Sequence, residues 1–207
     1  MKNWRDMGVK RYDRINVIGC SGSGKTTFSR RLAVLLGIPY VELDAVFWEP
    51  NWTIPANDVF YPRLERALEP DAWVLDGNYS RTVSIKWKRV QAVIWLDYSF
   101  ARTVFRSVKR ATTRAITKEE LWPGTGNRES FRKGFLSRDS IILWAIKNHS
   151  KIRQRYEALD VEGEYQHIDF IRMKSPREAE AYLKALGVAI VKNGEGAQAN
   201  PITIPQT

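Results

Sequence analysis

The feature of this sequence that most constrains its fold is the glycine-rich stretch GCSGSGKT at residues 19–26. The stretch matches the pattern G-x-x-x-x-G-K-S/T at every fixed position. The β-branched run RINVIG ends in its first glycine, and the helical pattern KTTFSRRLAVLL follows it and stops at Gly37. In this order of strand, loop and helix, glycines let backbone N–H groups point inward, and the positive end of the helix adds to their field. The stretch therefore predicts a phosphate-binding loop.

The residue types of the loop indicate ATP with a bound magnesium ion. Lys25 is expected to reach the β- and γ-phosphates, and the hydroxyl of Thr26 is expected to bind Mg²⁺. Cys20, the single cysteine, is interpreted as a small filler of the loop rather than as a reactive thiol. The residues expected to bind the nucleotide are Gly19, Ser21, Gly22, Ser23, Gly24, Lys25, Thr26 and Thr27.

Further apolar runs alternate with helical patterns along the chain. This alternation predicts right-handed crossovers and a parallel sheet covered by helices on both faces. Ligands of such sheets bind at the carboxyl ends of the strands, where Asp44, Asp76 and Asp97 lie. The expected strands after the first cover residues 38–44, 72–79, 92–99 and 165–173, and the expected later helices cover about 59–68, a basic stretch after Ser99, about 139–159, and 176–186.

Three local signals concern the ends of elements. Pro62 is expected in the first turn of its helix or at a kink, because proline lacks an N–H group. Ser175 is expected to cap the last helix, and Gly187 is expected to end it. The stretch after Asp44, AVFWEPNWTIPAND, is expected to form a loop.

The chain carries a formal net charge of +10, which favours an anionic partner such as phosphate, nucleic acid or anionic lipid. The segment 101–140 holds ten Lys or Arg against four acids, so much of the surplus lies there. A single cysteine excludes an intramolecular disulfide and fits a reducing compartment. The start lacks the apolar core of a signal peptide, and the longest apolar run, 141–146, is too short to span a bilayer. We therefore expect a cytoplasmic protein that does not enter membranes.

Beyond the loop, several specific segments resemble one family. They are GIPYVELDAVFW, VLDGNYS, VIWLD, GNRESFRKGFLSRDSIILWAI and RMKSPREAEAYL, within a match from about Arg14 to Leu186. On these segments the chain resembles the adenylate-kinase-like branch of P-loop kinases. Within that branch it looks most similar to bacterial proteins labelled DNA topology modulation protein.

The resemblance implies a fold and a division of the chain. The fold is an α/β P-loop NTPase sandwich of three layers, with a five-stranded parallel sheet of the nucleoside and nucleotide kinase type and a helical lid. It implies a single domain over residues 1–191, with an acceptor-binding region at about 44–70 and a basic lid at about 112–140. Residues 192–207 have little to bury and are expected to be a disordered tail.

The resemblance also implies roles for two residues near the end of the third strand. Asp76 matches the acid that helps to hold magnesium through water. Arg81 is displaced by one residue from the arginine that grips the phosphate of an acceptor nucleotide, so it is a candidate for acceptor binding.

The acceptor side is predicted from residue chemistry. A hydroxyl acceptor benefits from a carboxylate that acts as base or orienter, and Asp44 is the candidate for this role. The alternative is that Asp44 only caps a helix or loop. Trp48 is a candidate for stacking on the acceptor, and packing of its large apolar surface is the alternative.

Arginines of the expected lid are candidates for contacts with the transferred phosphate, because a guanidinium can follow charge spread over several oxygens. Arg128 and Arg138 are assigned to catalysis and Arg132 to substrate binding, as residues that arrive when a lid closes. The alternative for each is a solvated basic face.

Two classes of function fit these patterns. The first is a kinase that moves the γ-phosphate of ATP to a nucleotide, a nucleoside or another small acceptor, with Mg²⁺ as its metal. The second is a nucleic-acid-associated ATPase or DNA topology modulation protein, which the positive charge and the family label suggest. The kinase is favoured because basic residues gather in the expected lid. A nucleotide-binding regulator without turnover is a third possibility.

Overall fold

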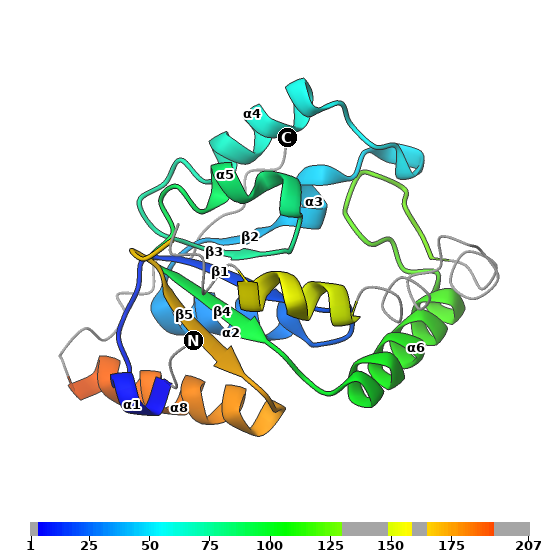
Figure 1. Ribbon diagram of the computed structural model, residues 1–207. Coiled ribbons are helices and arrows are strands. Elements are labelled where there is room, and N and C mark those ends of the chain that lie inside the picture. Colours follow the sequence, from blue (N-terminus) through cyan, green and yellow to red (C-terminus); the bar gives the residue numbers. More distant parts are fainter. Residues whose placement is uncertain (1–3, 130–148, 159–164, 193–207) are drawn as a thin grey trace.

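The computed structural model describes residues 4–129, 149–158 and 165–192. Within these ranges, five strands form one parallel sheet in the order β2-β3-β1-β4-β5, seen at the centre of Figure 1. This arrangement, with a glycine-rich loop directly after β1, confirms the expected P-loop NTPase α/β core. The strands are β1 (Arg14–Gly19), β2 (Tyr40–Glu42), β3 (Trp73–Asp76), β4 (Ala92–Leu96) and β5 (Asp169–Met173).

Helices cover both faces of the sheet. Figure 1 shows α1, α2 and α8 on one side of the sheet, and α3, α4 and α5 on the other. The helical residues 149–158 pack on the second side through Tyr156. The helices are α1 (Trp4–Met7), α2 (Lys25–Leu36), α3 (Leu43–Phe47), α4 (Asn57–Ala67), α5 (Val83–Lys86), α6 (Phe100–Thr117) and α8 (Pro176–Lys192), with short 3-10 turns at Pro50–Trp52 and Ser80–Thr82.

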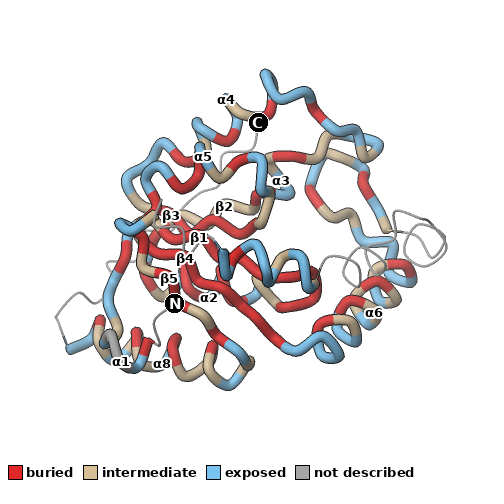
Figure 2. The backbone as a smooth tube through the Cα atoms, in the orientation of Figure 1, coloured by how far each residue is buried: buried red, intermediate tan, exposed pale blue. Residues whose placement is uncertain are grey.

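The core consists of two apolar layers, one on each face of the sheet. Neighbouring residues of a strand point to opposite faces, so Val17 joins the layer under α2 and α8, and Ile18 joins the layer under α3 and α4. Both side chains are fully buried, and Figure 2 shows β1, β3 and β4 as almost continuously buried. Each fully buried side chain of this size contributes about 1.5–3 kcal/mol. Burial on both faces explains why these strands read as continuous apolar runs rather than alternating ones.

The strand register brings the polar ends of the strands together. Asp76 at the end of β3 pairs with Val17 of β1 and with Glu42 at the end of β2. The phosphate loop begins at Gly19, two residues after Val17, on the same edge of the sheet. The carboxyl ends of β1, β2 and β3 therefore form one polar edge, as expected for a ligand site of a parallel sheet.

Two expectations about element ends are wrong, and one of the two alternatives for Pro62 is excluded. The stretch after Glu42 begins with the helix α3 rather than with a loop, so Asp44 is the second residue of a helix. Pro62 lies inside α4, which begins five residues earlier at Asn57, so it is not in the first turn. Gly187 lies inside α8: the Leu35 side chain passes 3.4 Å from where a Cβ would stand, and Ile190 beyond it is buried. Close packing against α2 explains this glycine.

Other expectations are confirmed or fall outside the described residues. Gly37 ends α2 with a left-handed φ of 67°. The hydroxyl of Ser175 accepts a hydrogen bond from the Glu178 N–H, as expected of a cap. The tail after Lys192 and the part of the expected lid from residue 130 onward lie outside the described residues.

One lysine is buried in the second apolar layer. Lys86, the last residue of α5, has 0% of its surface exposed. Its Nζ donates hydrogen bonds to the carbonyl oxygens of Asn78 at 2.9 Å and Gly77 at 3.3 Å. Burial lowers the pKa of Lys86 to about 7, because the charged form loses its hydration.

This shift predicts a pH-dependent stability. Above a pH of about 7 the folded protein holds a neutral amine, whereas the unfolded chain keeps its proton up to the ordinary pKa of 10.5. The unfolded state therefore binds more protons in this window, and the contribution of Lys86 to stability rises with pH. Relative to Lys86→Met, the unfolding free energy of the wild-type protein should rise by on the order of 1 kcal/mol per pH unit between about pH 7.5 and 9.5.

Chemical denaturation at several pH values measures this difference. Lys88→Met is the control, because Lys88 is exposed two residues further on and should give no such slope. A difference between wild type and Lys86→Met that stays constant with pH would contradict the burial of an ionisable amine.

Candidate active site

The phosphate loop is shaped by glycines and packed by α6. Gly22 and Gly24 have left-handed φ values of 84° and 89°, which side chains rarely adopt. A Cβ on Gly22 would stand 2.4 Å from the Thr103 carbonyl oxygen of α6. The Ser23 N–H donates to the Cys20 carbonyl at 3.1 Å, which closes the turn. The loop therefore needs glycine at position 22 for both conformation and close packing.

Two loop side chains, Lys25 and Thr26, make hydrogen bonds to polar groups of the protein. Thr26 Oγ1 donates a 2.6 Å hydrogen bond to Asp76 Oδ2, and Lys25 Nζ donates to the Cys20 carbonyl at 3.4 Å. Asp76 is buried at the end of β3. Burial raises its pKa, while the charge of Lys25 and the bond from Thr26 act to lower it. Thr26 and Asp76 thus lie together at the inner end of the loop.

These residues fit a magnesium ion. Asp76 Oδ1 is buried and has no hydrogen-bond partner among the described residues. A buried carboxylate oxygen of this kind calls for an additional donor or cation. Mg²⁺ binds through few protein oxygens and keeps several waters, so Thr26 and Asp76 would be sufficient to hold it. The described residues contain no cluster of three or more His, Cys, Asp or Glu that would make a protein-only metal site.

Asp44 lies near this pair and is held by a tyrosine. Tyr79 donates its hydroxyl proton to Asp44 Oδ1 at 2.8 Å. Crowding by surrounding protein raises the pKa of Asp44, although solvent reaches the residue; the Tyr79 bond and the charge of Lys25 act to lower it. The N-cap of α3 is Glu42, which makes no capping bond with its side chain. Asp44 therefore does not cap α3, and its carboxylate belongs to the polar edge of the sheet.

Glu42 is a member of this edge that sequence reasoning missed. Its Oε2 accepts hydrogen bonds from Arg30 at 3.0 Å and from the Tyr40 hydroxyl at 3.1 Å. Its Oε1 accepts one from Trp122 Nε1 at 3.2 Å. The Tyr40 hydroxyl is also 3.4 Å from Asp76 Oδ2. Glu42 lies at the end of β2, two residues before Asp44, and this position was the signal in the sequence that could have identified it.

Arg110 was counted in the basic helix but not selected for the site. Its Nη2 donates to Ser21 Oγ at 2.6 Å, and Ser107 Oγ donates to the Ser21 carbonyl at 3.0 Å. Its Nε is buried without a partner among the described residues. Burial lowers its pKa, and so does the charge of Arg114, while Asp44 and Asp76 act to raise it. The spacing of Ser107 and Arg110 on one helical face was the signal that could have found it.

Two other predicted residues, Arg81 and Arg128, make contacts outside the phosphate loop. Arg81 lies over the rings of Phe47 and Phe60, at 4.9 and 5.3 Å from their centroids. Arg128 is exposed and forms an isolated antiparallel bridge with Glu120. Thr27 is exposed on α2. Arg132 and Arg138 lie outside the described residues.

Trp48 belongs to a cluster of three indoles, which supports the packing alternative. Its ring is 5.4 Å from Trp52 and 6.3 Å from Trp122, measured between centroids. Trp122 comes from the segment after α6, so the cluster joins that segment to the acceptor region. Trp122 is only 9% exposed. The rings therefore pack on one another in this conformation.

Asn127 fastens the same two segments together. It is 1% exposed, its Oδ1 accepts from the Trp52 N–H at 2.8 Å, and its Nδ2 donates to the Glu49 carbonyl at 2.9 Å. Asn51 and Trp52 have φ values of 60° and 61°. This left-handed backbone is strained for a bulky residue and persists only where its surroundings enforce it. The hydrogen bond between Asn127 Oδ1 and the Trp52 N–H helps to hold this backbone conformation.

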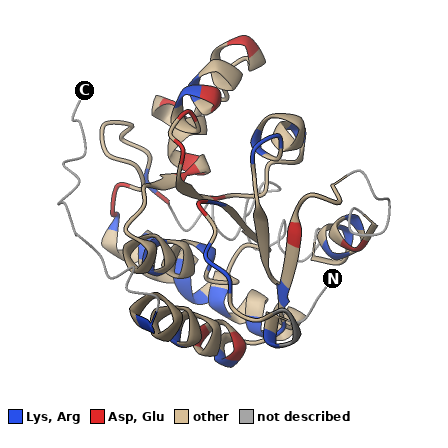
Figure 3. Cartoon of the chain, turned by 90° about the vertical axis from the view of Figure 1, so that its left-hand side faces the viewer, with Lys and Arg blue, Asp and Glu red and all other residues tan. Residues whose placement is uncertain are grey.

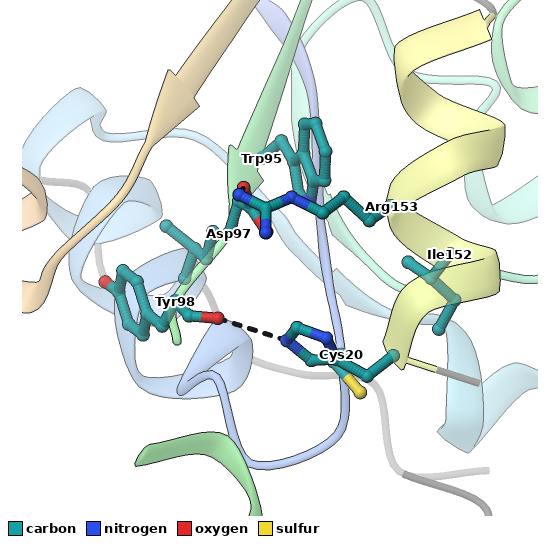
Figure 4. Close-up of a pocket in the computed structure, with 8 residues that line it drawn as sticks. Cys20, Trp95, Asp97, Tyr98, Ile152 and Arg153 are labelled. Atoms are coloured by element: carbon teal, nitrogen blue, oxygen red, sulfur yellow. Dashed lines mark hydrogen bonds and ion pairs between the residues drawn. The ribbon is translucent and has the colours of Figure 1, made fainter. Parts of the chain in front are cut away.

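A small pocket borders the phosphate loop at Cys20 (Figure 4). Its Asp97 accepts hydrogen bonds at Oδ2 from Arg153 at 2.9 Å and from Arg172 Nε at 2.8 Å. Burial raises the pKa of Cys20, which keeps the thiol protonated. Thr26, Asp44 and Asp76 do not line this pocket, and its own acid, Asp97, is paired with two arginines, so we assign the pocket to packing. It is lined by Cys20, Trp95, Leu96, Asp97, Tyr98, His149, Ile152 and Arg153.

Comparisons with known proteins concern the fold. No protein-family model matches the sequence, and no curated protein matches it. Among solved structures, a gluconokinase from Sinorhizobium meliloti 1021 is 19% identical with a TM-score of 0.46, and the shikimate kinase from Aquifex aeolicus vf5 is 17% identical with a TM-score of 0.47. Each match covers 89% of this chain and 99% of the other. No helix in the described residues is long and apolar enough to cross a membrane.

The role of Asn127 predicts the effect of its removal. Asn127→Ala removes the hydrogen bonds that a buried side chain makes to the Trp52 N–H and the Glu49 carbonyl, which should cost about 1–3 kcal/mol of unfolding free energy. The three indole rings should become more exposed to water, so the tryptophan emission of the folded protein should shift to longer wavelength. Denaturation followed by fluorescence measures both, with Asn57→Ala as an exposed control. Unchanged emission and stability would show that Asn127 does not hold the two segments together.

Proposed function

We propose that this protein is a Mg-ATP-dependent phosphotransferase that moves the γ-phosphate of ATP to a hydroxyl of a small acceptor. The observation that carries the proposal is the 2.6 Å hydrogen bond between Thr26 and Asp76, which joins the phosphate loop to a buried acid with one unpartnered oxygen. Asp44, a second acid, lies within electrostatic reach of Lys25. Donor, metal and acceptor groups are thus close together.

On the donor side, the loop residues 19–26 bind the phosphates through inward N–H groups, and Lys25 contacts the outer phosphates. Thr26 and Asp76 would hold Mg²⁺. The bound ion would supply positive charge that stabilises negative charge on the phosphates. The packing of α6 on the loop keeps these groups in place before the nucleotide arrives, which reduces the cost of ordering them.

Arg110 is suited to the charge that spreads over the transferred phosphate. It is anchored at Ser21 through Nη2, and its Nε is buried without a partner among the described residues. A buried guanidinium with a lowered pKa gains from an anionic partner. An arginine fork can follow equatorial oxygens, where a lysine acts as a point charge.

On the acceptor side, Asp44 orients the hydroxyl and accepts its proton. Tyr79 is the hydrogen-bond donor to Asp44 Oδ1 among the described residues, so Oδ2 can accept from the acceptor. A raised pKa makes Asp44 a better base than an ordinary aspartate. The charge of Glu42 acts to raise the pKa of Asp44. The charge of Asp44 in turn acts to raise the pKa of Asp76. This acidic surrounding favours a neutral hydroxyl over an anionic phosphate as the reacting group.

The nucleic-acid-associated ATPase, or DNA topology modulation protein, is the alternative. Two basic residues of α6 make contacts within the protein: Arg110 donates a hydrogen bond to Ser21, and Arg114 pairs with Glu129 at 3.1 Å. Arg102, Arg106 and Lys109 of the same helix are exposed. In Figure 3, Lys and Arg are spread over several helices rather than gathered in one stripe. These observations favour the kinase, because part of the charge has a use at the loop.

Phosphate transfer from Mg-ATP to a panel of nucleosides, sugars, hydroxy acids and nucleoside monophosphates, followed by mass spectrometry, tests the proposal. We expect one phosphorylated alcohol, made by the wild-type protein and not by Lys25→Ala. A phosphorylated nucleotide would contradict the hydroxyl acceptor. Release of ADP that depends on DNA, with no phosphorylated product, would instead support the alternative.

The role of Asp44 predicts a selective loss of turnover. Asp44→Asn keeps the shape of the side chain but removes the base, so kcat should fall about 10²–10⁴-fold. Binding of Mg-ATP should stay within about twofold, because the loop is unchanged. The control is Asp58→Asn, at an exposed position in α4. Normal turnover by Asp44→Asn would remove Asp44 from the mechanism.

A further inference from the structure

The turn after β3 connects three parts of the proposed active site. Asp76 receives the Thr26 hydroxyl, and Tyr79 donates to Asp44. Between them, Asn78 makes a pair of bonds to Gly19: its Oδ1 accepts from the Gly19 N–H at 3.0 Å, and its Nδ2 donates to the Gly19 carbonyl at 2.6 Å. Metal acid, phosphate loop and acceptor acid are therefore all tied to one turn, residues 76–79.

The Asn78 amide acts as an extra peptide group of the sheet. The backbone pairing of β1 with β3 ends at Val17 and Asp76. Two residues further along each strand, the side chain of Asn78 bonds both backbone groups of Gly19, as a neighbouring strand would. A Cβ on Gly19 would stand 2.7 Å from the Leu96 carbonyl oxygen, so the first residue of the loop is confined on two sides.

The backbone of this turn is held from behind by buried donors. Lys86 Nζ donates to the carbonyls of both Gly77 and Asn78. Asn16 Nδ2 donates to the Gly77 carbonyl at 3.2 Å, and the Tyr156 hydroxyl lies 3.4 Å from the Asn78 carbonyl. Lys86 alone among these contacts both peptide groups. The Nζ atom of Lys86 thereby holds both carbonyl groups pointing toward it.

We propose that Lys86 is a positioning residue, which holds the turn 76–79 so that Asn78 fixes Gly19 and the phosphate loop keeps its nucleotide-binding shape. This inference rests on the proposed function, because it assigns the loop to Mg-ATP. A buried lysine is a costly way to fill space, since its amine must either be desolvated as a cation or give up its proton. The two carbonyls that it satisfies are both in the turn that carries the site residues.

Loss of the donor should therefore weaken nucleotide binding by the folded protein. Lys86→Met keeps an unbranched side chain without a donor, and Lys86→Gln keeps a donor without a charge. We expect Lys86→Met to weaken Mg-ATP binding about tenfold in calorimetric titration, since two buried carbonyls lose a partner. Lys86→Gln should recover affinity to within about threefold of the wild type, because an amide still donates. Lys88→Met, at the exposed neighbour, should bind normally.

A purely structural role gives a different result. It would lower the thermal midpoint of Lys86→Met while the folded protein bound Mg-ATP as tightly as the wild type, and this result would overturn the proposal. An equal loss in Lys86→Met and Lys86→Gln would also overturn it, because a donor would then not be what matters.

A second variant covers the case in which Lys86→Met does not fold. Asn78→Ala removes the bonds to Gly19 on a partly exposed residue and should weaken Mg-ATP binding by a similar factor. Normal binding by Asn78→Ala would overturn the inference and leave the proposed function intact. Failure of the wild-type protein itself to bind Mg-ATP, or normal binding by Lys25→Ala, would overturn the proposed function and the inference with it.

Discussion

The hydrogen bond from Thr26 to Asp76 is the contact on which the rest of the site depends. It joins the first turn of α2 to the end of β3, two elements far apart in sequence, at 2.6 Å. The parallel register makes it possible, because Val17 and Asp76 are paired and the loop leaves β1 just beyond that pair. A shift of one residue in this register would turn Asp76 to the other face of the sheet. The apolar layers that fix the register therefore also fix the position of Asp76 beside Thr26.

The same edge of the sheet explains how a small set of contacts serves several purposes. The turn 76–79 reaches the phosphate loop through Asn78 and Asp44 through Tyr79. Glu42, at the end of β2, reaches the segment after α6 through Trp122. Movement of any of these elements would be transmitted to the others by direct hydrogen bonds. Rigid strands at the centre and polar turns at their ends give the site a defined geometry without a deep apolar pocket.

The parts of the structure that were predictable from the sequence are those set by local chemistry. The phosphate loop and the five strands follow from glycine spacing and apolar runs, and the strand ends pointed to Asp44 and Asp76 as residues of one polar edge. The missed parts depend on contacts between distant segments. Arg110 reads as one basic residue among several until α6 packs on Ser21, and Asn127 reads as a loop residue until it is buried against Trp52. Glycine at position 187 suggests the end of a helix. The structure instead places it inside α8 opposite Leu35 of α2, and this contact cannot be read from the local sequence.

The charges around the loop indicate which kind of ligand completes the site. Burial raises the pKa of Asp76 and lowers that of Arg110, so both groups are less stable as ions here than in water. A free phosphate would compensate Lys25 and Arg110 but would repel Asp76. A magnesium ion alone would compensate Asp76 but would repel the two cations. A magnesium nucleotide brings both signs of charge at once, so the site favours it over either ion alone.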